Sequence, residues 1–217
     1  MIKGVISDMD GVILDSEKLY VRFWREAANF YGYPMTTEHA LSIRSMARPF
    51  AIERLQGYFG EDFDYDLVRG KRVELMDAYV EKHGIEAKDG ARVLLVYLKK
   101  NGYKVALATA TAANRASQYL QRVGLLEFFD VVASARMVKN GKPKPDIYLY
   151  AAERLGLRPC ECVALEDSVN GVRSAAAAGC KTVLVPDLDN PEKELKPLLY
   201  DTANGLSDVI RIINNFT

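Results

Sequence analysis

The chain has 217 residues, 49% of them hydrophobic, and its 29 basic residues balance 29 acidic ones. This length and apolar content predict a globular protein with one domain and room for a sizeable insertion. The zero net charge excludes a general attraction to nucleic acid or to an anionic membrane, so any recognition of phosphate has to be local.

The first predicted element is a short buried strand, Val5–Ser7, after which the strand signal disappears from Ser16 to about Glu86. The intervening residues show the periodicity and the capping residues of successive helices. These are a helix with Leu19, Phe23, Ala27 and Phe30 on one stripe, a helix capped by Thr36 or Thr37, a helix from Pro49 to about Phe59, and a helix from Asp66 to His83. The region is therefore predicted to be an all-helical insertion.

After a return linker at residues 87–90, short apolar strands alternate with helices. The predicted strands are Tyr103–Ala108, Asp130–Ala133, Cys162–Leu165 and Thr182–Val185, and the predicted helices are Ala91–Lys100, Ala112–Val123, Asp146–Leu155, Val169–Ala178 and one from about Ser207. This alternation predicts an α/β fold with a Rossmann-like, doubly wound parallel sheet. The expected core is formed by residues 1–15 and 87–217, and the expected helical cap domain by residues 16–86.

Two further features bear on the location of the protein. No apolar run approaches the roughly 18 residues of a membrane-spanning helix, and the N-terminal residues show no charged leader with an apolar stretch, so we expect a cytoplasmic protein. The three cysteines, Cys160, Cys162 and Cys180, lack a paired C-x-x-C spacing. They are interpreted as reduced thiols, in preference to a zinc site or a disulfide.

Asp8, Asp10 and Gly11 follow directly after the first predicted strand. In an extended segment residues two apart point the same way, so the two carboxylates are expected to converge beyond the carboxyl end of the strand, where open α/β sheets bind ligands. Carboxylates so close together raise each other's pKa unless a cation lies beside them. The pattern predicts a hard metal ion, with Mg²⁺ favoured, and the alternative is a turn with two solvated aspartates.

Two later segments have residues suited to phosphate. Thr109-Ala110-Thr111 places a hydroxyl between a strand and a helix N-terminus, a combination that binds phosphate oxygens, although threonine is also an ordinary helix cap. In Asn140-Gly-Lys142-Pro-Lys-Pro-Asp146 the prolines restrict the backbone around Lys142. A lysine near Asp8 would keep that carboxylate ionised and offset its repulsion from a phosphate. Spacing alone leaves Lys144 as a second candidate, and a solvated loop lysine as the alternative to both.

The predicted strand at Cys162–Leu165 also ends in acidic residues, Glu166 and Asp167, followed by Ser168. Asp167 is a candidate to complete the ligand set of the metal, with Glu166 orienting a bound water. The alternative is that Asp167 or Ser168 only caps the next helix. Capping alone does not account for four polar strand ends in one sheet.

Taken together, these segments resemble the haloacid dehalogenase superfamily of phosphotransferases, in the branch with a helical cap inserted after the first strand. This branch includes β-phosphoglucomutases and small sugar-phosphate phosphatases. The resemblance covers essentially the whole chain and is carried by Asp8-Met-Asp-Gly-Val-Ile-Leu-Asp-Ser16, Thr109, Lys142-Pro-Lys-Pro-Asp146 and Leu165-Glu-Asp-Ser-Val-Asn-Gly171.

The resemblance implies a role for each matching residue. Asp8 is expected to be the nucleophile and Asp10 the general acid and base. Thr109 and Lys142 are expected to bind phosphate, which favours Lys142 over Lys144. Asp8, Asp167 and the carbonyl of Asp10 are the implied Mg²⁺ ligands. We add Ala110 to the expected phosphate-binding segment and Glu166 to the expected metal site.

The cap is expected to select the substrate. Arg44, Ser45 and Arg48 form a polar loop between two predicted helices that could reach a second phosphate or sugar hydroxyls, and Arg48 is our candidate substrate ligand. Solvated surface side chains are the alternative. The mutases of this family carry a histidine in the first cap helix, five residues after the aspartate that is here Asp15, whereas this chain has Tyr20. That difference weighs against a mutase.

The leading hypothesis from the sequence is a Mg²⁺-dependent phosphatase that hydrolyses a small phosphorylated sugar or related metabolite through an aspartyl phosphate. The second hypothesis is a β-phosphoglucomutase, and a third is a ligand-binding module without turnover. We expect a monomer whose partner is a small phosphorylated metabolite, with no nucleic acid and no membrane.

Overall fold

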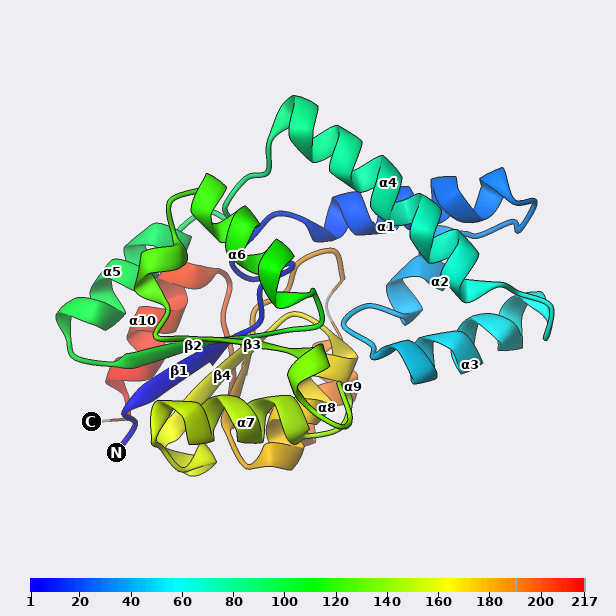
Figure 1. Ribbon diagram of the computed structural model, residues 1–217. Helices are drawn as coiled ribbons and strands as arrows, with labels where there is room; N and C mark the ends of the chain where they lie inside the picture. The colour runs from blue at the N-terminus through cyan, green and yellow to red at the C-terminus, as the bar shows by residue number, and fades with distance from the viewer. Residues whose placement is uncertain (190, 217) are drawn as a thin grey trace.

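A computed structural model describes residues 1–189 and 191–216 of the chain. Within these residues, six parallel strands form one sheet in the order β3-β2-β1-β4-β5-β6 (Figure 1). The strands are β1 (Gly4–Ser7), β2 (Lys104–Thr109), β3 (Val131–Ser134), β4 (Cys162–Glu166), β5 (Lys181–Leu184) and β6 (Asp201–Thr202). The chain winds outward from β1 in one direction and then, through β4, in the other. The carboxyl ends of β1 and β4 therefore flank the crevice where such folds bind ligands.

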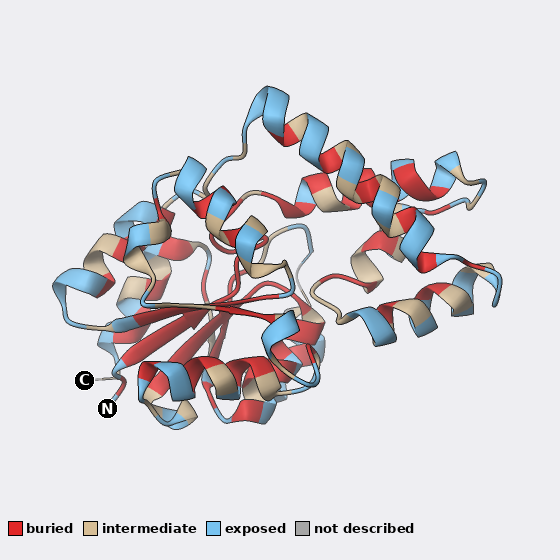
Figure 2. Ribbon diagram, viewed as in Figure 1, coloured by how far each residue is buried: buried red, intermediate tan, exposed pale blue. Residues whose placement is uncertain are grey.

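Helices cover both faces of the sheet (Figure 1). On one face lie α5 (Ala91–Lys100), α6 (Ala113–Arg122) and α10 (Leu206–Asn214), and on the other lie α7 (Asp146–Leu155) and α8 (Val169–Ala178). Side chains alternate between the faces along each strand, so Val5 joins the first set of helices in one apolar cluster and Ile6 joins the second set in another. Because both faces are covered, the central strands β1 and β4 are entirely buried, whereas the edge strands β3 and β6 are partly accessible (Figure 2). The predicted α/β fold is confirmed.

The first four helices form a separate layer beyond the carboxyl end of the sheet (Figure 1). They are α1 (Glu17–Phe30), α2 (Thr37–Ser42), α3 (Arg48–Phe59) and α4 (Tyr65–His83). Side-chain caps fix two of their starts, because Thr36 accepts a hydrogen bond from the backbone of His39 and Asp64 accepts one from that of Leu67. The four helices share an apolar cluster that includes Trp24 and Leu55. Parts of α1 and α4 also pack in the first cluster of the sheet, at Leu19, Phe23, Met76 and Val80. The cluster around Trp24 and Leu55 belongs to this layer alone, so we propose residues 16–86 as a cap domain.

The structure departs from the predicted elements in two places. Phe30, expected on the buried stripe of the first helix, is 67% exposed, because the stripe leaves the cap interior in the last turn of α1. The short elements β6 and α9 (Glu192–Leu195) were not predicted, since two and four residues are too few to show a hydrophobic period. Within the described part of the chain, no helix is both long and apolar enough to span a membrane.

Candidate active site

The acidic residues predicted for a metal site come together at the carboxyl ends of two neighbouring strands. Ser7 of β1 pairs with Leu165 of β4, so the residues that follow, Asp8 and Glu166, are brought side by side. Asp167 comes next, and ligand oxygens of these three buried carboxylates lie within 4.8 Å of one another. The parallel register of the two strands thus builds the cluster from segments far apart in sequence.

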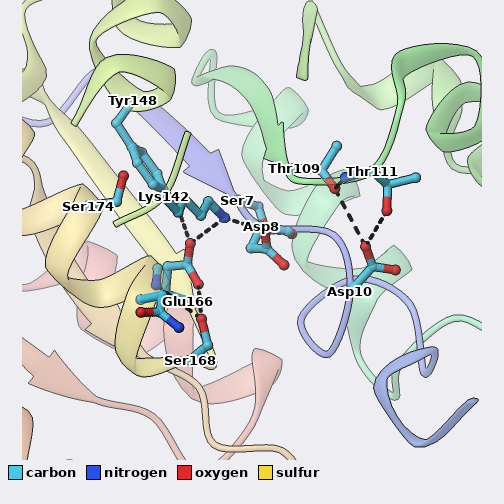
Figure 3. Close-up of polar contacts among 12 residues, drawn as sticks. Ser7, Asp8, Asp10, Thr109, Thr111, Lys142, Tyr148, Glu166, Ser168 and Ser174 are labelled. Carbon is cyan, nitrogen blue, oxygen red and sulfur yellow. Dashed lines mark hydrogen bonds and ion pairs between the residues drawn. The ribbon is translucent and has the colours of Figure 1, made fainter. Parts of the chain in front are cut away.

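Lys142 lies at the centre of this cluster and is 2% exposed (Figure 3). Its ammonium group forms ion pairs with Oδ1 of Asp8 and, at 2.6 Å, with Oε1 of Glu166. Burial alone would lower the pKa of Lys142, but the two carboxylates raise it above its usual value, so the lysine stays charged. Tyr148 of α7 also donates a hydrogen bond to Oε1 of Glu166. Lys142 is thereby held against Asp8, as predicted, and no contact of Lys144 with these acids is seen.

Two glycines make room for the carboxylates. A Cβ atom on Gly171, in the first turn of α8, would overlap the carboxylate of Glu166, and one on Gly11 would overlap that of Asp167. Gly11 also has φ +85°, a conformation that glycine adopts at little cost. The carboxylate of Asp167 therefore packs directly against the backbone that follows Asp10.

The carboxyl group of Asp10 belongs to a second, adjacent set of contacts (Figure 3). Ser16 donates a hydrogen bond of 2.6 Å to its Oδ1, and Thr111 donates one of 2.9 Å to its Oδ2. Thr109 lies 3.5 Å from the same Oδ2 and accepts a hydrogen bond from the backbone of Thr111. Burial raises the pKa of Asp10, while the hydrogen bonds from Ser16 and Thr111 lower it. A buried carboxyl group with a raised pKa is suited to give and take a proton.

The donor atoms of the acidic cluster fit a hard divalent cation. Among the described residues, no group donates a hydrogen bond to Oδ2 of Asp8 or to either carboxylate oxygen of Asp167. Oδ2 of Asp167 has only a long ion pair with Arg44, at 3.7 Å. Buried anionic oxygens that accept no hydrogen bond are costly, and a Mg²⁺ ion would satisfy them. Both oxygens of Glu166 are already engaged, by Lys142 and Tyr148 on one side and Ser168 on the other. Asp8 and Asp167 are thus the free donors, and Asp10 can offer only its backbone carbonyl, since its carboxylate faces the threonines.

A cavity of about 380 Å³ lies between the cap and the sheet. Asp8 and Asp10 face it from the core, together with Ala110 and Thr111, and Arg44 and Ser45 face it from the cap. Thr109 and Lys142 do not line the cavity but lie directly behind these residues, 0% and 2% exposed.

Arg48, the candidate substrate ligand from the sequence, is not brought to the cavity. Its side chain is 57% exposed and forms an ion pair with Asp66, which links the start of α3 to the start of α4. A structural contact between two cap helices accounts for this residue.

Three residues of the site were not assigned roles from the sequence. Ser16 ends the Asp8–Ser16 segment and Thr111 ends the Thr109–Thr111 segment, and both donate hydrogen bonds to Asp10. Tyr148 lies two residues after Asp146 on a helix whose other inward residues are apolar. The available signal was its hydroxyl group, because a buried tyrosine usually finds a hydrogen-bond partner.

Comparison with known proteins agrees with this geometry. Residues 2–179 match the family model of haloacid dehalogenase-like hydrolases, and the chain belongs to this family. A phosphorylated carbohydrates phosphatase of Thermotoga maritima is 36% identical over 187 residues, which cover 84% of each chain. Hexitol phosphatase A of Escherichia coli is 34% identical over 84% of this chain and 82% of its own. The solved structure of a β-phosphoglucomutase from Clostridium difficile is 26% identical, with a TM-score of 0.81 over 99% of this chain and 96% of that one.

Proposed function

We propose that the protein is a Mg²⁺-dependent phosphatase that hydrolyses a small phosphorylated sugar or related metabolite through an aspartyl phosphate on Asp8. The observation that carries this proposal is the asymmetry of the Asp8 carboxylate. Lys142 holds Oδ1, whereas Oδ2 accepts no hydrogen bond from the described residues, and Asp8 lines the cavity. Lys142 fixes the carboxylate through Oδ1 and favours its ionised form, so Asp8 presents an open carboxylate edge to a phosphoryl group in the cavity, as in-line attack requires.

The reaction divides into two steps. In the first, a carboxylate oxygen of Asp8 bonds to phosphorus, the bond from phosphorus to the leaving oxygen breaks, and Asp10 gives its proton to the leaving alcohol. In the second, Asp10 takes a proton from water as the water oxygen attacks phosphorus, which releases inorganic phosphate and restores Asp8. Ser16 and Thr111 orient Asp10 for both transfers, and its raised pKa supports them.

Charge near the phosphoryl group is provided from two directions. On one side, Lys142 lies between Asp8 and Glu166 and supplies a positive charge. On the other side, the Thr109-Ala110-Thr111 segment precedes the N-terminus of α6, whose backbone N–H groups attract an anion. Bound Mg²⁺, held by Asp8, Asp167 and the carbonyl of Asp10, would supply positive charge to the phosphoryl oxygens.

The relatives support the substrate class. Two proteins more than a third identical to this chain are named for phosphorylated carbohydrates and hexitols, and a cavity of about 380 Å³ suits a small molecule. The similarity to a β-phosphoglucomutase keeps phosphoryl transfer through a sugar bisphosphate as the second candidate. Against it, Tyr20 lines the cavity and bonds to Thr111, at the position where we expected a histidine in a mutase.

Time-resolved ³¹P NMR separates the two candidates. The protein is incubated with Mg²⁺ and β-glucose 1-phosphate, with and without a trace of glucose 1,6-bisphosphate, and then with a panel of sugar monophosphates. Release of inorganic phosphate from at least one panel member is expected. Bisphosphate-dependent formation of glucose 6-phosphate without free phosphate would show a mutase instead, and no reaction with any member would contradict both.

A further inference from the structure

Arg72 is a buried arginine that forms no ion pair with any described residue, although its charge lowers the pKa of Asp10 from a distance. It lies on α4, is only 7% exposed and lines the cavity between the cap and the sheet. No hydrogen bond or ion pair joins its guanidinium group to any described residue, and its Nε atom is fully buried without a partner. Because an unpaired buried charge is strongly unfavourable, this arrangement indicates that an anion completes it.

Aromatic rings hold the guanidinium group in place. Its central carbon lies 5.0 Å from the ring centroid of Tyr20 and 5.5 Å from that of Trp24. Stacking of this kind occupies the faces of a guanidinium group and leaves its N–H groups for in-plane hydrogen bonds. The rings thus orient Arg72 without neutralising it.

Arg69 adds a second positive charge at the same place. It lies three residues before Arg72, on the same side of α4, and also lines the cavity without an ion pair to any described residue. Burial lowers the pKa of Arg72, Tyr20 raises it in part, and the positive charge of Arg69 lowers it further. Two like charges side by side are unfavourable unless a negative group lies between or beside them.

The other arginines around the cavity differ in this respect. Arg115 forms ion-pair contacts through both terminal nitrogens with Asp77, and Arg44 pairs with Asp189 and Asp167. Arg136 is exposed to solvent at the rim. Among the described arginines that line the cavity, the half-buried Arg69 and the buried Arg72 are therefore neither paired in a salt bridge nor fully exposed.

The position of Arg72 relates it to the reacting groups. The ring of Tyr20 lies between the guanidinium group and Thr111, whose hydroxyl group bonds to the Tyr20 hydroxyl at 3.0 Å and donates to Asp10 at 2.9 Å. Tyr20 and Thr111 thus connect Arg72 to Asp10, the residue proposed to protonate the leaving group. A small molecule whose phosphoryl group faces Asp8 can place its far end beside Arg72.

We infer that Arg72 and Arg69 form a subsite for a second anionic group of the substrate, a carboxylate or phosphate at the end remote from the transferred phosphoryl group. This inference rests on the proposed phosphatase function and narrows its substrate class to phosphorylated acids and bisphosphates. A planar guanidinium group binds either anion through paired hydrogen bonds, so the chemistry of the site is shared by both.

Matched substrates test the subsite in the wild-type enzyme with Mg²⁺. Glucose 1-phosphate, glucuronate 1-phosphate and glucose 1,6-bisphosphate of one anomer differ only at C6, which is uncharged, a carboxylate or a phosphate. Glycerol 3-phosphate and glycerate 3-phosphate form an acyclic pair. We expect kcat/KM to be about 10-fold to 100-fold higher for the doubly anionic member of at least one set, the effect of one charge-assisted hydrogen-bonded contact. A higher kcat/KM for glucuronate 1-phosphate would indicate a carboxylate subsite, and a higher kcat/KM for glucose 1,6-bisphosphate a phosphate subsite.

Substitutions then assign the selectivity to Arg72. In Arg72→Gln the ratio of kcat/KM for charged over uncharged substrate is expected to fall about 10-fold to 100-fold. Arg72→Lys keeps the charge but loses the planar group, so its ratio should lie between those of the wild type and Arg72→Gln. Arg115→Gln is the matched control, because this arginine faces the same cavity but is already paired with Asp77, and it should retain the ratio. If Arg72→Gln does not fold, Arg69→Gln provides the same comparison.

A binding measurement makes the outcome independent of turnover. Trp24 is the single tryptophan of the chain and lies beside Arg72, so its fluorescence reports on this end of the cavity. In Asp8→Asn, we expect tighter binding of the doubly anionic ligands and loss of that preference when Arg72→Gln is added. Equal binding and equal kcat/KM of charged and uncharged partners would overturn the inference and leave the phosphatase standing. Lack of phosphate release from every panel member would overturn the phosphatase, and the fluorescence titration would still decide the subsite.

Discussion

Arg44, from the cap, is hydrogen bonded to the residue of the core that is proposed to hold the metal, Asp167. Its Nη2 atom donates to the backbone carbonyl oxygen of Asp167 at 3.0 Å and also pairs with Asp189 at 2.5 Å, while Nη1 lies 3.7 Å from Oδ2 of Asp167. In return, Asn170 donates to the backbone carbonyl of Arg44 at 2.9 Å. The closed position of the cap is therefore linked directly to the loop after β4.

Removal of the Arg44 side chain should weaken both cap closure and catalysis. In Arg44→Met we expect kcat/KM to fall about 10-fold to 100-fold, because a buried charge-assisted hydrogen bond to the metal-binding loop is lost. Asp189→Asn is the matched control. It removes only the partly exposed ion pair, so it should change kcat/KM less than about threefold. Hydrogen exchange in the α2–α3 loop should increase in the first variant only, and unchanged exchange and rate would refute the link.

Asp8→Asn should abolish turnover without loss of the fold. An amide cannot serve as the nucleophile, so kcat is expected to fall by more than ~10³-fold. The substitution preserves the shape of a buried side chain whose pKa burial raises, and we expect no large fall in melting temperature. Asp15→Asn, at a half-buried position of the same segment paired with Lys18, should leave the rate nearly unchanged. Comparable rates in the two variants would exclude Asp8 as the nucleophile.

The sequence was sufficient for the fold and for most of the acidic cluster. The strand period and the polar strand ends placed Asp8 and Asp167 at one edge of a parallel sheet, because parallel strands bring their carboxyl ends together whatever their spacing in the chain. Spacing left Lys142 and Lys144 as alternatives, and only the family resemblance favoured Lys142. The direction of the Asp10 side chain could not be obtained in this way. It depends on hydroxyl groups from Ser16 and Thr111, which reach Asp10 only after the cap and the sheet have packed.

The cap was the least predictable part of the site. From the sequence, Arg48 was expected in a polar loop facing the substrate, whereas Arg72 looked like an ordinary charged residue of a helix. Which of them faces the cavity depends on how α4 packs against α1, and this contact buries Arg72 beside Tyr20 while Arg48 pairs with Asp66 at the surface. The helical period shows which residues share a face, but the charge of one residue does not show which face is buried.

Tyr148→Phe should lower both stability and activity. The hydroxyl group of Tyr148 is completely buried and donates to Glu166, which in turn pairs with Lys142. Its loss is expected to cost about 1–2 kcal/mol in the free energy of unfolding in urea, because one buried acceptor loses a donor. We also expect a several-fold lower kcat, since Glu166 positions Lys142. Tyr150→Phe on the same helix is the control, because its hydroxyl group bonds to no described residue, and an equal loss in both variants would rule out this role for Tyr148.

Mg²⁺ should stabilise the protein through Asp8 and Asp167. At a Mg²⁺ concentration tenfold above its dissociation constant, we expect the melting temperature to rise by roughly 3–5 °C, because the ion binds only the folded cluster. Chelation should reverse the rise and abolish turnover. Asp167→Asn should lose the shift, whereas Asp187→Asn, which removes a nearby carboxylate paired with Lys88, should retain it. A shift that survives in Asp167→Asn would place the ion elsewhere.

Two glycines, Gly70 within α4 and Gly171 in the first turn of α8, should respond in opposite ways to the same substitution. Alanine favours a helix over glycine by about 1 kcal/mol, so Gly70→Ala in α4 is expected to stabilise the protein by ~0.5–1 kcal/mol, because no atom lies within 4 Å of the added methyl group. In Gly171→Ala the same gain is outweighed, since the methyl group would overlap the carboxylate of Glu166.

For Gly171→Ala we expect a net loss of about 1–3 kcal/mol in the free energy of unfolding, which is typical of overpacking a buried site. Displacement of Glu166 should also release Lys142 from its place between two carboxylates, so kcat should fall together with stability, whereas Gly70→Ala should leave kcat unchanged. Urea unfolding and phosphate release, measured on both variants, test the pair. Stabilisation by Gly171→Ala would mean that Glu166 can move aside without cost and that its contact with Lys142 does not depend on the glycine.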